Sequence, residues 1–199
     1  CRRLCWSLVG LIGAVALLAS CHGQPDNTFF DVSTTVDGAD AVPGDGVCEI
    51  TVGAGDCSLR AAVTEANAVE GPVAWIRVPA GAYVLDRVGT DDDNDAGDLD
   101  VAPRAGSLVI AGADSGVVVD GAGADGVVDV RSGTVVLGGI GIRGSGGPGV
   151  RVRPDADAVV SFATVAGSAG PGVEVATRAS LRVLQATVAG NGVGGVANA

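Results

Sequence analysis

The stretches GSGGPGVRV (144–152), GSAGPGVEV (167–175) and GNGVGGVAN (190–198) repeat one pattern of small residues at a spacing of 23 residues. The same spacing, carried one step back from the first stretch, reaches Gly121 and Val127. Four successive units therefore share one register. Self-similarity at a period of about 20–50 residues is typical of repeat architectures.

Apolar positions outside these stretches keep the same phase. They form two series, Leu137/Val160/Val183 and Ile142/Val165/Val188. Short strands joined by glycine-rich corners favour a parallel β-solenoid, in which each coil stacks on the last at about 4.8 Å. We expect both series inside the solenoid, with Ser145, Ser168 and Asn191 as a corner stack. The predicted fold class is all-β, a solenoid over 29–199 whose coils follow the period of the repeat.

The register also pairs charges of opposite sign. Arg151 falls over Glu174, and Asp155 falls over Arg178. We expect cross-rung ion pairs, each contributing about 0–1 kcal/mol if exposed. This interpretation is preferred to a functional arginine cluster.

A short amphipathic segment, CSLRAAVTEAN (57–67), precedes the repeats. Its apolar residues recur at helical spacing and form one narrow stripe, whereas its polar residues lie elsewhere on the helix. Ser58 is placed as the N-cap of a helix over about 58–68. Such a short helix is marginal alone, so we expect it to dock on an apolar surface of the chain that follows. The apolar stripe consists of Leu59, Ala62, Val63 and Ala66.

Residues 1–20 have the order of a secretory signal, with two arginines, an apolar run and then small residues. The apolar run is short for a transmembrane helix, which needs about 20 residues. The ending LASC (18–21) resembles a bacterial lipobox, which implies cleavage before Cys21 and a lipid anchor on it. His22 at the next position then favours the outer membrane. The alternative is an ordinary cleaved signal, and residues 21–28 are interpreted as a tether.

Once the signal is removed, Cys48 and Cys57 are the only cysteines besides Cys21. In the oxidising compartments outside the cytosol they are expected to form a disulfide, worth about 2–3 kcal/mol for so small a loop. A catalytic cysteine would need a base, but the only histidine, His22, lies beside the anchor. Two cysteines without a well-placed histidine also argue against zinc.

The overall charge limits the class of partner. The chain has 12 arginines and no lysine against 23 acids, a net charge of -11. Such a chain repels nucleic acid and anionic lipid, so neither is expected as a partner.

CSLRAAVTEAN resembles the CSLREA motif of exported bacterial proteins with right-handed parallel β-helix repeats, the pectin-lyase-like architecture. The segments VPAGAYVL, GDLDV (97–101) and ATVAGN (186–191) are similar to further elements of such chains. The resemblance implies that the helix caps the first coil. Ala61 stands where the family has Glu, so the reciprocal half of a capping box is lost.

The segment DDDNDAGDLD (91–100) is the most site-like stretch, since oxygen-rich loops of this density can bind calcium. Its spacing does not match an EF-hand, and a solvated acidic loop is the alternative. The candidate calcium ligands are Asp91, Asp93, Asp95, Asp98 and Asp100.

Two functions remain open from the sequence. The preferred one is a non-catalytic, lipid-anchored surface protein whose solenoid is a spacer, an adhesion element or a binding face for glycan or protein. The alternative, implied by the resemblance, is a polysaccharide lyase or glycoside hydrolase. Its candidate residues are Asp120, Asp125 and Asp129 on one face and the cluster Arg143, Arg151 and Arg153. The chain begins without Met and ends inside the fourth unit, so we expect a piece of a longer protein.

Overall fold

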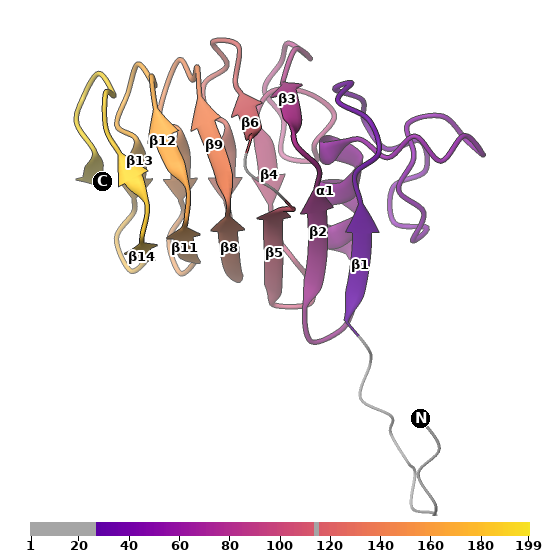
Figure 1. Cartoon of the computed structure of the whole chain (residues 1–199). Helices are drawn as coiled ribbons and strands as arrows, with labels where there is room; N and C mark the ends of the chain where they lie inside the picture. The colour runs from indigo at the N-terminus through magenta and orange to yellow at the C-terminus, as the bar shows by residue number, and fades with distance from the viewer. Residues whose placement is uncertain (1–26, 114–115) are drawn as a thin grey trace, which may run out of the picture.

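The computed structural model describes residues 27–113 and 116–199. The predicted signal, the lipidation residue Cys21 and most of the tether lie outside the described residues. The described part is mostly β, with sixteen strands and one helix (Figure 1), and it contains no helix long and apolar enough to cross a membrane. The helix is α1 (Leu59–Ala68), and the strands are β1 (Thr28–Asp31), β2 (Ala74–Val78), β3 (Gly81–Val84), β4 (Leu99–Val101), β5 (Ser107–Gly112), β6 (Val117–Asp120), β7 (Val128–Val130), β8 (Thr134–Gly138), β9 (Ile140–Arg143), β10 (Val150–Val152), β11 (Asp157–Ser161), β12 (Thr164–Ala166), β13 (Val173–Val175), β14 (Ser180–Leu184), β15 (Thr187–Val188) and β16 (Val196–Asn198).

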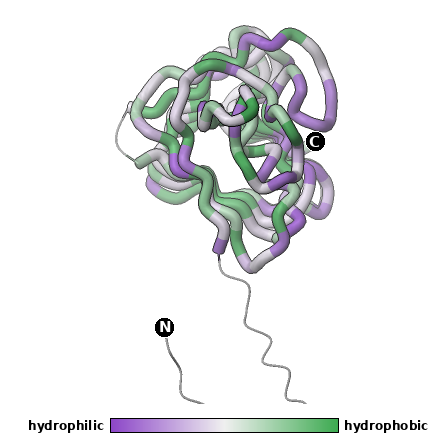
Figure 2. The backbone as a smooth tube through the Cα atoms, turned by 90° about the vertical axis from the view of Figure 1, so that its right-hand side faces the viewer, coloured by the Kyte–Doolittle hydropathy of each residue, from purple (hydrophilic) through white to green (hydrophobic). Residues whose placement is uncertain are grey.

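The strands form three parallel sheets. Sheet A has the order β1-β2-β5-β8-β11-β14, sheet B the order β3-β6-β9-β12-β15, and sheet C the order β4-β7-β10-β13-β16. Neighbours within a sheet come from successive coils, so the chain passes through the sheets in turn and stacks coil on coil (Figure 1). Seen from the end that carries α1, the coils overlie one another (Figure 2). This arrangement is that of a parallel, solenoid-like fold.

The last coils keep the spacing predicted from the sequence. Asp157 pairs with Ser180, and Val150 pairs with Val173, each at the predicted period. The predicted alignment of Val127 with Val150 is wrong, because Val128 is the residue that pairs with Val150. The chain between those two strands is therefore slightly shorter than the period.

The earlier coils are longer than this period. Leu99 pairs with Val128, and Ala74 pairs with Leu108, so each of these coils contains additional chain. The additional chain includes the loop 85–98 between β3 and β4. This loop forms part of the site described below.

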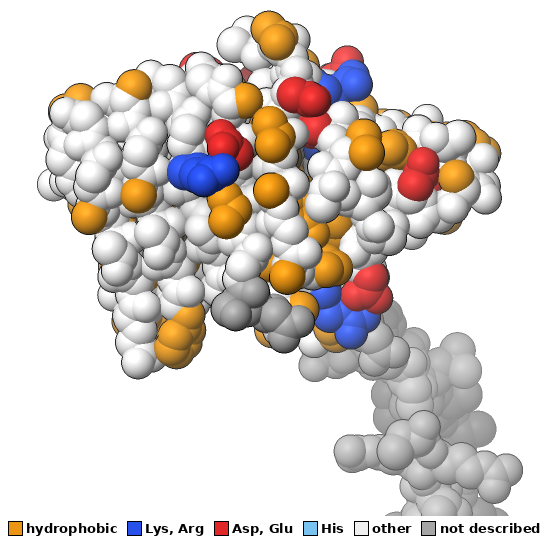
Figure 3. Space-filling model, turned by 45° about the horizontal axis from the view of Figure 1, so that its top comes forward, with side chains coloured by type: hydrophobic (Ala, Val, Ile, Leu, Met, Phe, Trp, Pro, Cys, Tyr) orange, Lys and Arg blue, Asp and Glu red, His pale blue; other side chains and the backbone are white. Residues whose placement is uncertain are grey.

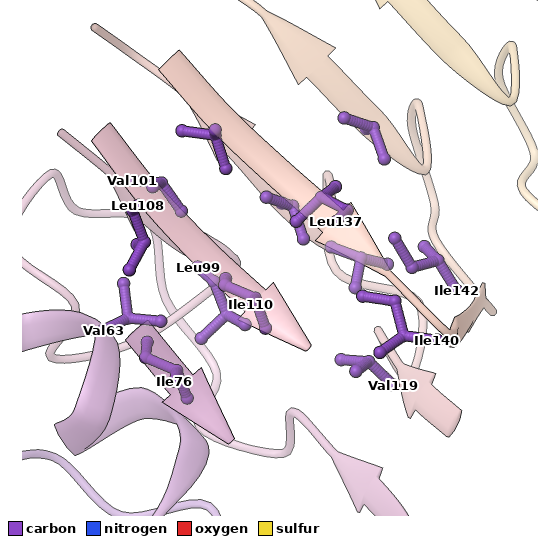
Figure 4. Packing of buried hydrophobic residues seen from close by; sticks show 14 of the residues in the cluster. Val63, Ile76, Leu99, Val101, Leu108, Ile110, Val119, Leu137, Ile140 and Ile142 are labelled. Carbon is purple, nitrogen blue, oxygen red and sulfur yellow. The ribbon is translucent and has the colours of Figure 1, made fainter. Parts of the chain in front are cut away.

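Small aliphatic side chains fill the interior between the sheets. The two predicted series are in register across the sheets, and their members in the middle coils are fully buried. Val183, in the last coil, is 40% exposed. Figure 4 shows Val63 of α1 packed near Ile76 and Leu108 at the start of this core. Each fully buried side chain of this kind contributes about 1.5–3 kcal/mol.

Glycine and the corner stack define the turns. Gly144, Gly167 and Gly190 have φ values of +73°, +70° and +68°, in the left-handed region that favours glycine. The predicted corner stack is present: the N–H of Ala169 donates to the Ser145 carbonyl at 2.8 Å, and the N–H of Ser168 donates to Asn191 Oδ1 at 3.0 Å. The positive φ values explain why glycine recurs at these three corners.

The helix α1 begins as predicted. Ser58 is the N-cap, and its Oγ accepts a hydrogen bond from the N–H of Ala61 at 2.9 Å. The predicted disulfide between Cys48 and Cys57 is present beside this cap. The helix packs on β1, β2 and β4, at the N-terminal end of the solenoid.

The prediction of a single narrow buried stripe on α1 is too narrow. Arg60 and Glu65 are fully buried as well as Val63. The Glu65 carboxylate accepts two backbone N–H groups from the loop 37–46, and Arg60 binds both that loop and residues 96–98. These loops close over the polar side of the helix and satisfy its charged groups.

Both predicted cross-rung ion pairs are present. Arg151 Nε lies 3.2 Å from Glu174 Oε2, and Arg178 Nη2 lies 2.7 Å from Asp155 Oδ2. The second pair is exposed at both ends, so solvent screens it strongly. It is therefore interpreted as a surface pair rather than part of a site.

Candidate functional site

A cavity of about 400 Å³ opens on the outer face of sheet C, over the early coils. This volume lies in the range of small-ligand sites, about 300–1,000 Å³. We call this cavity the sheet C cleft. It is lined by Thr90, Asp91, Asp92, Asp98, Asp100, Asp125, Asp129, Arg131, Arg151 and Arg153.

Sheet C places a row of charged side chains along the cleft. The two residues that flank Asp100 in β4 are buried in the core, so the alternation of a strand turns Asp100 to the outer face. In register across the sheet, the row is Asp100, Asp129, Arg151 and Glu174. Successive members are about 4.8 Å apart. A polymer lying along the solenoid would therefore meet one charged side chain per coil.

Two arginines neutralise the buried carboxylates of this row. Arg153 Nε lies 2.9 Å from each carboxylate oxygen of Asp129. Arg131 Nη1 lies 3.0 Å from Asp100 Oδ1 and 3.8 Å from Asp129 Oδ2, and it also pairs with the exposed Asp92. The side chains of Asp100 and Asp129 are each 2% exposed, so solvent screens these pairs weakly. Without the arginines, two facing buried carboxylates would be strongly destabilising.

Two carboxyl groups of the cleft ionise with difficulty. Burial raises the pKa of Asp100 to about 7, although the hydrogen bond from Arg131 opposes the shift. Burial also raises the pKa of Asp98 to about 6, and the nearby charge of Asp125 adds to the effect. Both groups therefore exchange protons near neutral pH, a property concentrated at functional sites.

Arg60 of α1 holds the chain that enters the cleft. All five of its guanidinium N–H groups have acceptors: two bind the Asp37 carboxylate at 2.7 and 3.0 Å, and three bind the carbonyls of residues 96–98 at 2.7–3.2 Å. The Arg60 side chain is 0% exposed and that of Asp37 is 2% exposed. Because the bonded carbonyls directly precede β4, Arg60 ties the cap helix to the position of Asp98.

Two asparagine side chains close the edge of sheet C. Asn94 Oδ1 accepts from the N–H of Asp100, and Asn94 Nδ2 donates to the Asp100 carbonyl, both at 2.8 Å. Asn67 of α1 donates to the same carbonyl and accepts from the N–H of Ala102, both at 2.8 Å. Asn94 has a φ of +66°, a conformation that Asn tolerates better than most residues. These bonds fix the backbone of Asp100 and hence the direction of its carboxylate.

The five acids predicted as calcium ligands are divided between two places. Asp91, Asp98 and Asp100 line the cleft, whereas Asp93 and Asp95 do not. Asp91 Oδ1 accepts the backbone N–H groups of Asp93 and Asp95, and Asp95 pairs with an arginine outside the cleft. Among the described residues, no group of three or more His, Cys, Asp or Glu side chains is arranged to hold a metal ion.

The sequence candidates for an enzyme are also divided. Asp125 and Asp129 line the cleft, but Asp120 lies on sheet B, where it pairs with Arg143 at 2.9 Å. Arg131 lines the cleft too, although no sequence pattern indicates it. The constant period of the last coils could not reveal this set, because the early coil that aligns Asp100 with Asp129 is longer than that period.

Comparisons of the chain with protein-family models, with curated proteins and with solved structures returned no match.

Proposed function

We propose that this protein is an exported, surface-attached β-solenoid that binds a glycan in the sheet C cleft. The observation that carries the proposal is the cleft itself, where buried carboxylates lie beside arginines on one face of the sheet. Sugar hydroxyls both donate and accept hydrogen bonds, so they match a lining that offers both kinds of partner.

The arrangement of the row favours a polymer over a compact ligand. Its members come from four successive coils and are about 4.8 Å apart, so they extend along the solenoid rather than around one point. The net charge of -11 disfavours nucleic acid, the other common extended ligand.

We also propose that the solenoid is a right-handed parallel β-helix of the pectin-lyase-like type. Right-handed crossovers between parallel strands are strongly preferred, and the CSLRAAVTEAN stretch supports the same architecture by resemblance. The signal-like residues 1–20 support export and a lipid anchor at Cys21 on a bacterial outer membrane or cell surface. The solenoid would then act as a spacer that presents the cleft.

A second candidate is hydrolysis of the bound glycan. Glycosidases use one protonated acid and one ionised carboxylate. Burial raises the pKa of Asp98, which has no ion pair with a described residue, so it is the candidate proton donor, whereas Asp129 is ion-paired with Arg153. This difference between neighbouring carboxyl groups is the observation that favours the second candidate.

Retention of the purified protein on a panel of immobilised neutral, acidic and amino-sugar glycans tests the proposal. We expect retention on at least one class, and weaker retention for Arg151→Met, which removes a cleft guanidinium at a half-buried position. Equal retention of both proteins, or retention on no glycan, would contradict binding in the cleft. New reducing ends in the same incubations would favour the second candidate.

A further inference from the structure

The sheet C cleft contains more carboxylates than guanidinium groups. Six aspartates and three arginines line it, so its net charge is -3 when all are ionised. Each arginine already has an acidic partner, because Arg131 and Arg153 bind the buried carboxylates and Arg151 binds Glu174. Three of the lining acids form no ion pair within the described part of the chain, and these are Asp91, Asp98 and Asp125.

Asp98 is the most enclosed of these acids. It is 7% exposed and lines the cleft. Its backbone carbonyl binds Arg60, but its carboxylate has no ion pair or hydrogen bond with another described residue. The carboxylate lies against Gly126, where an added Cβ would be 2.5 Å from Asp98 Oδ2. Apart from its own backbone N–H, no described group donates to this carboxylate, so it can accept hydrogen bonds from a ligand.

A second acceptor lies on the same face. Oδ1 of Asp100 accepts from Arg131, but its Oδ2 is buried and has no hydrogen-bond partner among the described residues. Asp98 directly precedes β4, and its side chain and that of Asp100 line the same cleft. The carboxylates of Asp98 and Asp100 can therefore both accept further hydrogen bonds from a ligand in the cleft.

We propose that the glycan bound in the sheet C cleft is cationic and built from amino sugars, and that one of its ammonium groups binds between Asp98 and Asp125. This inference rests on the proposed function and adds the class of ligand. An ammonium group brings three N–H donors and one positive charge, which match the unpaired acids. The hydroxyls of the same sugars remain available to the arginines.

Other ligands match the cleft less well. Acidic polysaccharides meet a net negative lining on a chain of charge -11. A lysine-rich peptide has the charge, but its side chains carry no acceptor for the cleft arginines. An amino-sugar polymer combines the charge with both kinds of hydrogen-bonding group.

Binding of an ammonium group beside Asp98 is expected to release protons from the protein. Burial and the charges of Asp125 and Asp129 raise the pKa of Asp98 to about 6, with Arg151 opposing the shift. A bound ammonium group favours the ionised carboxylate, so binding near this pH releases protons. A neutral glycan would not require this release.

Titration calorimetry on the purified protein at about pH 6, in two buffers of different ionisation heat, tests the inference. The probes are an oligomer of glucosamine, the N-acetylated oligomer of equal length, an oligogalacturonate and oligolysine. We expect the glucosamine oligomer to bind with proton release and the acetylated one to bind at least about tenfold more weakly.

Matched variants locate the ammonium site. Asp98→Asn is expected to lower the affinity about 10- to 100-fold and to reduce the proton release. Gly126→Ala keeps every charge but displaces the Asp98 carboxylate, so it should weaken binding as well. Asp93→Asn removes the same charge from the same loop outside the cleft and should leave the affinity unchanged. Circular dichroism of each variant checks that it is folded.

The contrary outcomes are distinct. Preferential binding of the acetylated or acidic oligomer, weakened by Arg151→Met, would overturn the amino-sugar inference and leave the proposed function standing. Tighter binding of oligolysine with the same sensitivity to Asp98→Asn would overturn it in favour of a cationic peptide. If no oligosaccharide bound, the inference and the proposed function would both fail.

Discussion

The first and the last coils of this solenoid use the same parallel strands but differ in their connections. The last coils keep one constant period, with glycine at their corners. The first coils need more chain between paired positions, and their loops carry buried charged and amide groups. The ion pair between Arg60 and Asp37 is fully buried, whereas that between Arg178 and Asp155 is exposed.

The difference separates the scaffold from the site. Regular coils can stack with small side chains alone, but a cleft needs irregular loops, and these need buried polar groups to hold them. In Figure 3, charged side chains are few on the visible face and lie away from the C-terminal coils at its left. The following changes test whether stability and site both depend on the first coils.

The largest effect is expected for Arg60→Ala. It leaves Asp37 buried without its partner and frees three carbonyls, so we expect a loss of about 3–5 kcal/mol. Urea denaturation measures the loss. The control is Arg182→Ala, which removes an exposed arginine from the last coils. Equal midpoints for the two variants would contradict the contrast between the regions.

Removal of the disulfide is expected to have the next largest effect. The Cys48→Ser, Cys57→Ser double variant opens a loop with a sequence separation of 9, and we expect a loss of about 2–3 kcal/mol. Thermal melting with and without reductant gives the measurement. If reductant left the melting temperature of the wild type unchanged, the disulfide would not stabilise the fold as expected.

Asn94→Gly separates the asparagine side chain from its backbone conformation. Glycine accepts the φ of +66°, so the variant loses the two bonds to Asp100, about 1–2 kcal/mol, and incurs a smaller entropic cost because its unfolded chain is freer. Hydrogen exchange at the Asp100 amide should be faster, with little change in the last coils. Asn94→Ala should be less stable than Asn94→Gly, because alanine is strained at this φ. The reverse order would refute this interpretation.

The pH dependence of stability is a smaller effect. The pKa of Asp98 is about 6 when folded against 3.8 as its ordinary value, so the folded state binds more protons between these values. Stability therefore falls as the pH rises through this window. Asp98→Asn should remove the part of the decrease that Asp98 causes, leave the part that Asp100 causes, and be more stable than the wild type at about pH 8. If the urea midpoints of the wild type and of Asp98→Asn changed with pH in parallel, the raised pKa of Asp98 would be contradicted.

The smallest effect is expected for Arg178→Ala in the last coils. Its partner Asp155 is exposed, so solvent already screens the pair. The urea midpoint should not change measurably. A loss comparable with that of Arg60→Ala would remove the distinction between exposed and buried pairs.

The regular part of the fold follows from the sequence because its spacing is constant. The series that begins with Leu137 and the positive-φ glycines are visible from the phase of the repeat alone. Ser58 and the apolar face of α1 predict the cap helix, since capping and helical periodicity are local. The error of alignment at Val127 comes from a slightly shortened turn.

The residues of the sheet C cleft could not be predicted from the repeat in the same way. Asp100 and Asp129 become neighbours only through a coil longer than the repeat, and no local pattern gives that length. The helical periodicity places Arg60 outside the apolar stripe and so predicts that it is exposed. Its burial could not be predicted, because it depends on hydrogen-bond acceptors from two distant loops. Dense acids at 91–100 make calcium a candidate ligand, but local density does not show that Asp93 and Asp95 lie outside the cleft that Asp91, Asp98 and Asp100 line.

The most direct test of the central claim is an NMR titration of the isotope-labelled protein with a glycan that it retains. Binding in the sheet C cleft predicts shifts at Asp98, Asp125 and Arg151, and none in β14 or β16 of the last coil. Shifts confined to the last coils, with the cleft residues unchanged, would contradict the assignment of the cleft as the binding site.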